Sequence, residues 1–316
     1  MNGRLSDTIE KLGFVVNDGA MATELEAMGC DLNDELWSAK VLREAPEFIK
    51  KVHMSYYEAG ADVGCSASYQ ATVPGLIKKG CSIEEAEALI KLSVRLARSA
   101  ADEWWNERPR KDRVYPLVAA SVGSYGAYLA DGSEYRGCYS VSRDELKQFH
   151  ARRMELLRDA GADFFAIETI PSIEEGGILA ELSDELGLEC WICFSCRSGS
   201  ENCEGTPIGE CAKVVMAHES VKAVGVNCTP PQYVESLIRE IKSVCALPVC
   251  VYPNSGEEYD PVTKSWHGAT GGATYVDYAK TWLNAGASII GGCCRTTPRD
   301  IRAVYELIEA KRASRS

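Results

Sequence analysis

The chain has 316 residues, of which 46% are hydrophobic and 25% are charged, a composition typical of soluble globular proteins. Its formal net charge of −12 argues against a protein that binds nucleic acids or acidic membranes, because both partners are bound through basic surfaces. No stretch approaches the roughly 18 apolar residues of a membrane span, and the first residues lack the apolar core of a signal peptide, so we expect a cytoplasmic protein.

In chain order, short apolar runs bounded by turn residues predict buried parallel strands. They cover residues 14–18, 62–68, 115–122, 164–169, 189–196, 223–228, 248–254 and 288–293. Amphipathic stretches of helical period alternate with them, at residues 45–59, 83–105, 143–160, 173–186, 233–243, 275–285 and 298–311. Glycines follow several of these stretches and predict helix ends, at Gly60, Gly161, Gly187 and Gly286.

The joints between helix and strand repeat along the chain. An Ala-Gly-Ala sequence leads from a helix directly into a strand at residues 59–61, 160–162 and 285–287. Repetition of this joint indicates repeated βα units. The alternative is an open doubly wound sheet, but no glycine-rich dinucleotide motif follows the first strand. We therefore expect a single-domain (β/α)8 TIM barrel over residues 1–316.

Two long connections follow the third and seventh predicted strands, at residues 123–137 and 255–266. Both leave the carboxyl ends of strands, where barrel enzymes keep their active sites. They could be surface loops without a role. Their aromatic and charged residues favour loops that cover a substrate.

A cysteine pair, Cys293 and Cys294, ends the eighth predicted strand and follows two glycines. Adjacent side chains of a regular strand point to opposite faces, so one metal could not reach both. The glycine pair lets the backbone leave the strand conformation and removes this objection. The alternatives are two unrelated buried thiols, or a redox pair, which would lack the usual C-x-x-C spacing.

A further cysteine, Cys228, ends the sixth predicted strand. Alternate strands of such a barrel supply side chains to the same interior layer, so the three thiols could converge at one end. Three protein ligands and one open position characterise catalytic zinc, and thiolates favour zinc over magnesium or calcium. We interpret Cys190, Cys193 and Cys196 as core residues. The four histidines, His53, His150, His218 and His267, lack ligand spacing.

These motifs resemble those of the homocysteine S-methyltransferase family, which includes betaine–homocysteine methyltransferase and the homocysteine module of cobalamin-dependent methionine synthase. The resemblance runs essentially end to end and includes residues 18–25, 225–228 and 291–294. Residues 67–72, 128–137 and 251–257 are most similar to the branch that uses S-methylmethionine.

The resemblance implies that Cys228, Cys293 and Cys294 bind Zn²⁺, and that Glu168 holds the ammonium group of homocysteine. The substrate contacts that it implies are Asp18, Gly19, Ser66, Ser68, Gln70, Glu168 and Asn227. From the residues alone, Asp18 and Glu168 could instead be structural carboxylates at the barrel rim. Betaine enzymes carry a tyrosine in place of Gln70 that can occupy the fourth zinc position, and an amide cannot act as that phenolate.

The expected reaction is methyl transfer from S-methylmethionine, with S-adenosylmethionine as a second donor, to the thiol of homocysteine, giving methionine. Zinc would deprotonate the thiol, and a neutral thioether leaves, so no general acid is required. The alternatives are another acceptor such as selenocysteine, or a zinc-stabilised barrel without catalysis. We expect small-molecule partners only, and a monomer or weak homo-oligomer.

Overall fold

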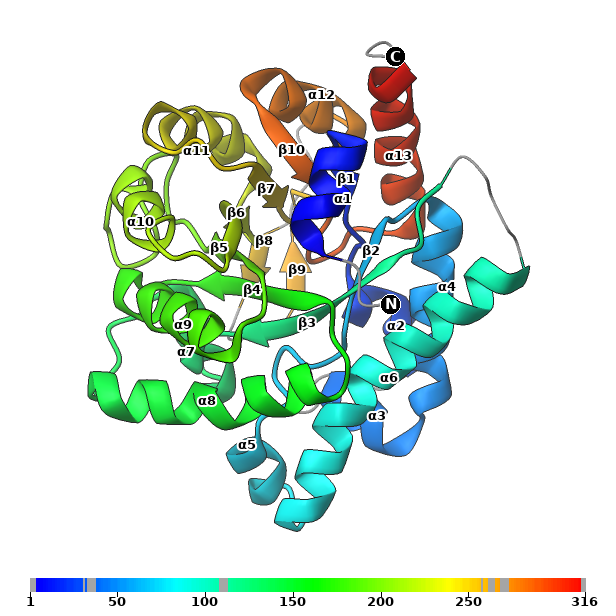
Figure 1. Ribbon diagram of the computed structural model, residues 1–316, viewed down its shortest axis with the longest axis vertical. Coiled ribbons are helices and arrows are strands. Elements are labelled where there is room, and N and C mark those ends of the chain that lie inside the picture. The colour runs from blue at the N-terminus through cyan, green and yellow to red at the C-terminus, as the bar shows by residue number, and fades with distance from the viewer. Residues whose placement is uncertain are drawn as a thin grey trace.

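The computed structural model describes residues 4–30, 32, 38–107, 113–256, 258–260, 265–267 and 273–313. Eight parallel strands form the central sheet, with helices around it (Figure 1). The strands are β1 (Val15–Val16), β2 (Val63–Cys65), β3 (Leu117–Gly123), β4 (Phe164–Ile170), β5 (Cys190–Phe194), β6 (Val221–Asn227), β7 (Val249–Tyr252) and β10 (Ala287–Ile290). The TIM-barrel prediction is thus confirmed, and each strand overlaps a predicted run.

An antiparallel hairpin, β8 (Glu258–Asp260) with β9 (Ser265–His267), follows β7 and was not predicted. It lies in the connection of residues 255–266, of which residues 257 and 261–264 are outside the described part of the chain. The side chain of His267 is outside it as well. The second strand also differs from its prediction, because it ends at Cys65 and the chain turns through residues 66–70.

The helices predicted from amphipathic period are all present. They are α4 (Pro46–Ala59), α6 (Ile83–Glu107), α8 (Arg143–Asp159), α9 (Ile173–Leu186), α11 (Pro231–Val244), α12 (Tyr275–Ala285) and α13 (Pro298–Ala313). Gly60, Gly187 and Gly286 end three of them in the left-handed conformation that glycine adopts without steric cost. No helix in the described ranges combines the length and apolar character that crossing a membrane requires.

Several shorter helices were not predicted. They are α1 (Leu5–Leu12), α2 (Met21–Ala27), α3 (Ser38–Glu44), α5 (Val73–Lys78), α7 (Tyr125–Leu129), α10 (Ile208–Val215) and the 3-10 turn η1 (Ser133–Tyr135). Each has eight residues or fewer, too short for a helical period to stand out in the sequence. Two of them, α7 and η1, form most of the long connection after β3.

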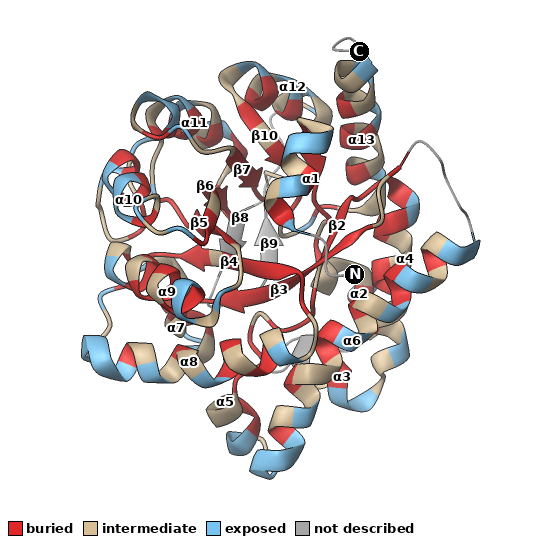
Figure 2. Ribbon diagram, viewed as in Figure 1, coloured by how far each residue is buried: buried red, intermediate tan, exposed pale blue. Residues whose placement is uncertain are grey.

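The hydrophobic core has two layers, one inside the barrel and one between the strands and the helices (Figure 2). Trp191 fills the barrel interior, with its ring centroid 4.7 Å from that of Phe164, and its indole N–H donates to the Tyr252 hydroxyl at 3.1 Å. Cys193 lies in this inner layer and Cys190 in the outer one. Both are fully buried, as predicted for core cysteines.

The barrel closes between β1 and β2, where a single parallel bridge joins Asn17 to Val63. Asp62 supports this seam. Its carboxylate lies 3.3 Å from the guanidinium of Arg113 and 2.6 Å from that of Arg312, which comes from α13. The last described helix therefore helps to hold the first strand in place.

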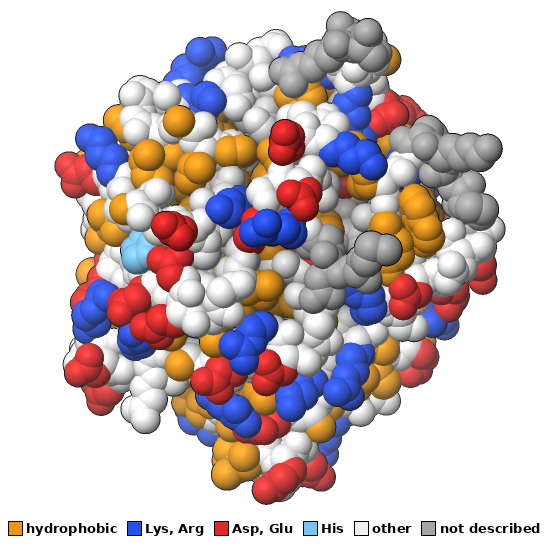
Figure 3. Space-filling view, viewed as in Figure 1, with side chains coloured by type: hydrophobic (Ala, Val, Ile, Leu, Met, Phe, Trp, Pro, Cys, Tyr) orange, Lys and Arg blue, Asp and Glu red, His pale blue; other side chains and the backbone are white. Residues whose placement is uncertain are grey.

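The face of the molecule in Figure 3 carries acidic and basic side chains that alternate over the surface. Neither sign forms a continuous patch on this face. The view therefore shows no basic surface of the kind that nucleic acids require.

Candidate metal centre and substrate cavity

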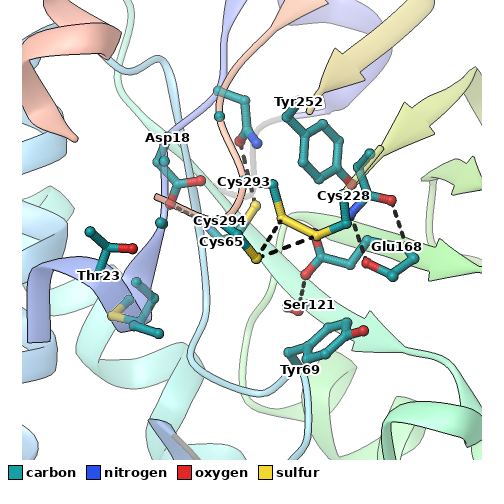
Figure 4. Close-up of a pocket in the computed structure, with 18 of the residues that line it drawn as sticks. Asp18, Thr23, Cys65, Tyr69, Ser121, Glu168, Cys228, Tyr252, Cys293 and Cys294 are labelled. Carbon is teal, nitrogen blue, oxygen red and sulfur yellow. Dashed lines mark hydrogen bonds between the residues drawn. A yellow bond between two sulfur atoms is a disulfide. The ribbon is translucent and has the colours of Figure 1, made fainter. Parts of the chain in front are cut away.

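A cavity of about 220 Å³ opens at the carboxyl ends of the barrel strands (Figure 4). Residues at the ends of β1, β2, β3, β4, β6, β7 and β10 line it, together with the segments that follow them. This is the end at which TIM barrels place their active sites. The cavity is large enough for an amino-acid-sized ligand and has both thiol and carboxyl groups in its wall.

Three cysteines gather on one side of this cavity. The Sγ atom of Cys294 lies 3.9 Å from that of Cys228 and 3.9 Å from that of Cys293. Cys228 and Cys293 are joined as a disulfide in this structure, as Figure 4 shows. Metal binding by all three residues therefore requires that this pair be reduced.

Glycines allow the thiols to meet. The strand β10 ends at Ile290, so Cys293 and Cys294 lie outside the strand, in the turn that follows. A Cβ atom on Gly292 would lie 2.3 Å from the Thr296 hydroxyl, and one on Gly291 would lie 2.6 Å from the side chain of Asn17. The glycine pair thus acts by letting this turn pack tightly against its neighbours.

The backbone of Cys228 is also specialised. Its φ of +45° places it in the left-handed region directly after β6, and its N–H donates to the Tyr252 carbonyl at 3.3 Å. This kink turns the side chain out of the alternation of the strand. The thiol consequently faces those that follow β10, two strands away in the sheet.

The cluster suits zinc. Zn–S bonds of about 2.3 Å in a tetrahedron place sulfur atoms about 3.8 Å apart, which agrees with the two distances of 3.9 Å from Cys294. Among the described residues, no fourth cysteine, histidine or carboxylate joins the three thiols. This donor set leaves one position for an exogenous ligand, the arrangement of catalytic zinc.

Two carboxyl groups line the same cavity as the thiols. Glu168, in β4, accepts a hydrogen bond from the Ser121 hydroxyl. Burial raises its pKa to about 7, although hydrogen bonds from Ser121 and Tyr252 oppose the rise. Asp18, after β1, accepts from the Cys65 N–H at 2.7 Å. Burial, with a smaller contribution from Glu168, raises the Asp18 pKa to about 8.

These pKa shifts indicate that both groups lack a cationic partner in the described structure. A ligand ammonium placed beside them would restore their ionised forms and would gain charge-assisted hydrogen bonds. The cavity therefore has one wall suited to a metal-bound thiolate and another suited to an ammonium group.

The remaining predicted contacts have different positions. Gly19, Ser66, Gln70 and Asn227 line the cavity. Ser68 is fully buried and is not among the lining residues, because its hydroxyl donates to the Ser121 carbonyl at 2.7 Å. Ser68 thus supports the wall from behind.

Gln70 and Asn227 also have structural partners. The Gln70 side-chain amide donates to the Ala127 carbonyl at 3.2 Å, which links the turn after β2 to α7. Asn227 holds Thr169 through two hydrogen bonds of 2.6 and 2.8 Å. Both amides therefore fix neighbouring segments of the cavity wall.

The structure adds lining residues that the sequence did not single out. They are Met21, Thr23, Cys65, Tyr69, Ser121, Glu134, Tyr135, Thr169 and Tyr252, among others. Glu134 and Tyr135 belong to the connection of residues 123–137, whose aromatic and charged content was the signal for a substrate-covering loop. This loop does contribute to the cavity, whereas much of the other long connection lies outside the described residues.

The chain is similar to known proteins over most of its length. Residues 15–308 match the family model for homocysteine S-methyltransferases. The chain is 51% identical to homocysteine S-methyltransferase YbgG of Bacillus subtilis, over 92% of this chain and 93% of the relative. It is 47% identical to selenocysteine Se-methyltransferase of Brassica oleracea, over 95% of this chain and 90% of the relative.

A solved structure is similar over nearly its whole length. The metallated form of homocysteine methyltransferase MmuM from Escherichia coli superimposes with a TM-score of 0.86 at 43% identity, covering 96% of this chain and 99% of that one. The likeness therefore includes the barrel and the loops at its carboxyl end.

Proposed function

Because this chain belongs to the homocysteine S-methyltransferase family, we propose that it transfers a methyl group from S-methylmethionine to homocysteine, giving methionine. The observation that carries the proposal is the convergence of three thiols on an open cavity that also contains two uncompensated carboxyl groups. The three thiols suit a metal that binds the sulfur of homocysteine, and the two carboxyl groups suit its ammonium group.

Cys228, Cys293 and Cys294 hold the zinc ion in this proposal. When bound, zinc lowers the pKa of the acceptor thiol, so that a thiolate is present at neutral pH. The existence of a metallated form of the E. coli relative supports a metal in this chain. A cluster of three described ligands favours a reactive site over a closed structural one.

Glu168 and Asp18 bind and orient the acceptor. The Ser121 hydroxyl fixes the Glu168 carboxylate, and the Cys65 N–H fixes that of Asp18. Homocysteine held by its ammonium at these carboxylates can direct its sulfur towards the thiol cluster, because both sets of residues line one cavity. Such positioning replaces a bimolecular encounter with an oriented contact.

The transfer needs no proton donor. The acceptor sulfur forms a bond to the methyl carbon while the bond from that carbon to the donor sulfonium breaks. The electron pair of the broken bond stays on the departing sulfur, which becomes a neutral thioether. The thiol proton leaves to solvent before the transfer, and both products are methionine.

Selenocysteine is a second candidate acceptor. The relative from Brassica oleracea that carries this activity in its name is 47% identical to the chain. A selenol is as soft a donor as a thiol and could occupy the same open position. A direct competition between the two acceptors decides which is preferred.

The test uses deuterated homocysteine with zinc-loaded, reduced protein. Labelled methionine from the acceptor and unlabelled methionine from S-methylmethionine should appear in equal amounts. Cys294→Ser should lose its zinc and at least about 100-fold of the activity. Cys138→Ser is the matched control, because Cys138 is exposed and is not a member of the cluster.

Each part of the proposal has its own contradicting outcome. Labelled methionine from S-adenosylmethionine but not from S-methylmethionine would remove the donor assignment. No labelled methionine from either donor would remove the activity, and full zinc content in Cys294→Ser would remove the ligand set.

A further inference from the structure

Glu134 lies in η1 and lines the cavity, although neither the predicted contacts nor the metal cluster includes it. Its backbone is tightly held. The Ser195 hydroxyl donates to the Glu134 carbonyl at 2.9 Å. Gly126 of α7 packs so closely that a Cβ atom there would lie 2.4 Å from the Glu134 nitrogen. The residue therefore has a fixed place in the wall.

The carboxylate of Glu134, in contrast, has an unused acceptor. Its Oε2 atom is buried and has no hydrogen-bond partner among the described residues. Burial raises the pKa of this carboxyl and Asp131 adds to the rise, whereas a hydrogen bond from its own backbone N–H and the charge of Arg136 oppose it. Arg136 is exposed and lies 3.5 Å from the Asp131 carboxylate. A carboxylate oxygen that is buried without a hydrogen-bond partner is costly, so a cationic ligand is the expected partner of Oε2.

Two tyrosines line the same cavity as Glu134, namely Tyr69 and Tyr135. Tyr135 is the next residue of η1, and Tyr69 comes from the turn after β2. The charge of Glu134 contributes to the raised pKa of both phenols, after the larger effect of burial. Aromatic faces attract cations that cannot donate hydrogen bonds, such as methylated onium groups. The tyrosines suit a sulfonium, and the carboxylate suits a cation with N–H donors.

The cationic groups of the two substrates can be assigned to these carboxylates and tyrosines. Homocysteine has one ammonium group, for which the proposed function uses Glu168 and Asp18. S-methylmethionine brings a second ammonium group and a sulfonium. The described cavity wall offers Glu134 and the two tyrosines for these two cations.

We propose that the Glu134 carboxylate binds the α-ammonium group of the methyl donor, while the rings of Tyr69 and Tyr135 border the sulfonium. This inference deepens the proposed function and rests on it. It identifies the donor class as sulfonium compounds that carry an amino group. Glu134 is a donor-binding residue in this scheme and takes no part in acceptor binding.

The experiment compares wild type with Glu134→Gln. The substitution keeps the shape of the side chain and removes its charge. The KM for S-methylmethionine should rise about 10-fold or more, as for the loss of a charged hydrogen bond. The KM for homocysteine and the zinc content should change less than about twofold, since the acceptor wall and the thiols are untouched.

A donor analogue separates the ammonium from the sulfonium. The probe is 3-dimethylsulfoniopropanoate, a sulfonium without an amino group, measured as an alternative donor and as a competitor of S-methylmethionine. Glu134→Gln should leave its affinity unchanged. An analogue too weak to bind even the wild type would also support the assignment, because the ammonium would then be required.

Asp131→Asn is the matched control. It removes the same charge from the same loop, and the asparagine oxygen can still accept the two hydrogen bonds that Ser133 donates to Asp131. Its KM values should equal those of the wild type. Equal losses for both donors in Glu134→Gln, or an unchanged KM for S-methylmethionine, would overturn the inference alone. A wild type that does not use S-methylmethionine would overturn the proposed donor and this inference together.

Discussion

The Asn227 side chain holds Thr169 with both of its polar atoms. Its Oδ1 accepts from the Thr169 N–H at 2.6 Å, and its Nδ2 donates to the Thr169 hydroxyl at 2.8 Å. Thr169 has a φ of +59°, an unfavourable conformation for a β-branched residue. The pair therefore couples the residue after Glu168 to the residue before Cys228.

Asn227→Ala should lower the free energy of unfolding by about 2–4 kcal/mol, because two buried hydrogen bonds are lost and the Thr169 N–H and hydroxyl are left without this partner. The KM for homocysteine should rise as Glu168 shifts. Urea unfolding and steady-state kinetics measure the two effects. Asn106→Ala, at an exposed position of α6, is the control. A change in stability below about 0.5 kcal/mol would contradict the role given to this pair.

His53 is a buried ionisable group without an acid–base role. It is fully buried in α4, and neither ring nitrogen has a hydrogen-bond partner among the described residues. Burial lowers its pKa from 6.5 to about 4. Between these two pH values the unfolded chain binds a proton that the folded chain does not, so stability falls as the pH falls through this range.

His53→Phe should remove this dependence. Relative to the variant, the wild type should lose about 3 kcal/mol of stability between pH 7 and pH 4. At pH 7 the two should differ little, because the replacement removes polar atoms that have no partner. Urea unfolding at several pH values measures the difference, with His218→Phe at the partly exposed surface as control. Parallel curves for wild type and His53→Phe would refute the prediction.

Gly225 allows β6 and β7 to approach. A Cβ atom there would lie 1.6 Å from the Cys250 carbonyl oxygen, which belongs to the backbone and cannot move aside. Gly225→Ala should lower the free energy of unfolding by more than about 4 kcal/mol and should reduce zinc binding, because Cys228 follows three residues later.

Substitution of a second glycine is expected to raise the free energy of unfolding instead of lowering it. Gly177 lies within α9, and its nearest neighbour to an added Cβ is a Val214 methyl at 3.5 Å. Gly177→Ala should therefore stabilise the protein by about 0.5–1 kcal/mol. Thermal unfolding measures the stability of both variants. A Gly225→Ala protein as stable as the wild type would contradict the first prediction, because β6 and β7 could then separate without cost.

The barrel could be predicted because its strands carry continuous apolar runs that end at turn residues. The sequence showed that Cys228 and the pair Cys293 and Cys294 follow alternate strands, at the same end of the barrel. Their meeting depends on the left-handed backbone of Cys228 and on the turn after β10, which the alternation of strand residues does not predict. Short helices were missed, as in the five-residue α7. Ser124 caps its N-terminus by accepting a hydrogen bond from the Ala127 N–H. Such a segment is decided by a cap and by tertiary contacts.

Cavity residues that lie in turns were harder to predict from the sequence than those at the ends of strands. Ser68 was expected at the cavity, but β2 ends at Cys65, and the alternation of a strand no longer applies beyond it. Tyr69 lines the cavity instead. Glu134 reaches the cavity because η1 packs on Gly126, a contact between loop segments that no periodic pattern encodes.

The closure of the barrel at β1 has a consequence for folding. This two-residue strand pairs with β10, its neighbour in space but almost the whole described chain away in sequence. The ion pair of Asp62 with Arg312 adds a link of similarly long range, 250 residues apart in sequence. On a ribosome, β1 would emerge long before its partner, and Asp18, which follows it, would be positioned only when synthesis is nearly finished.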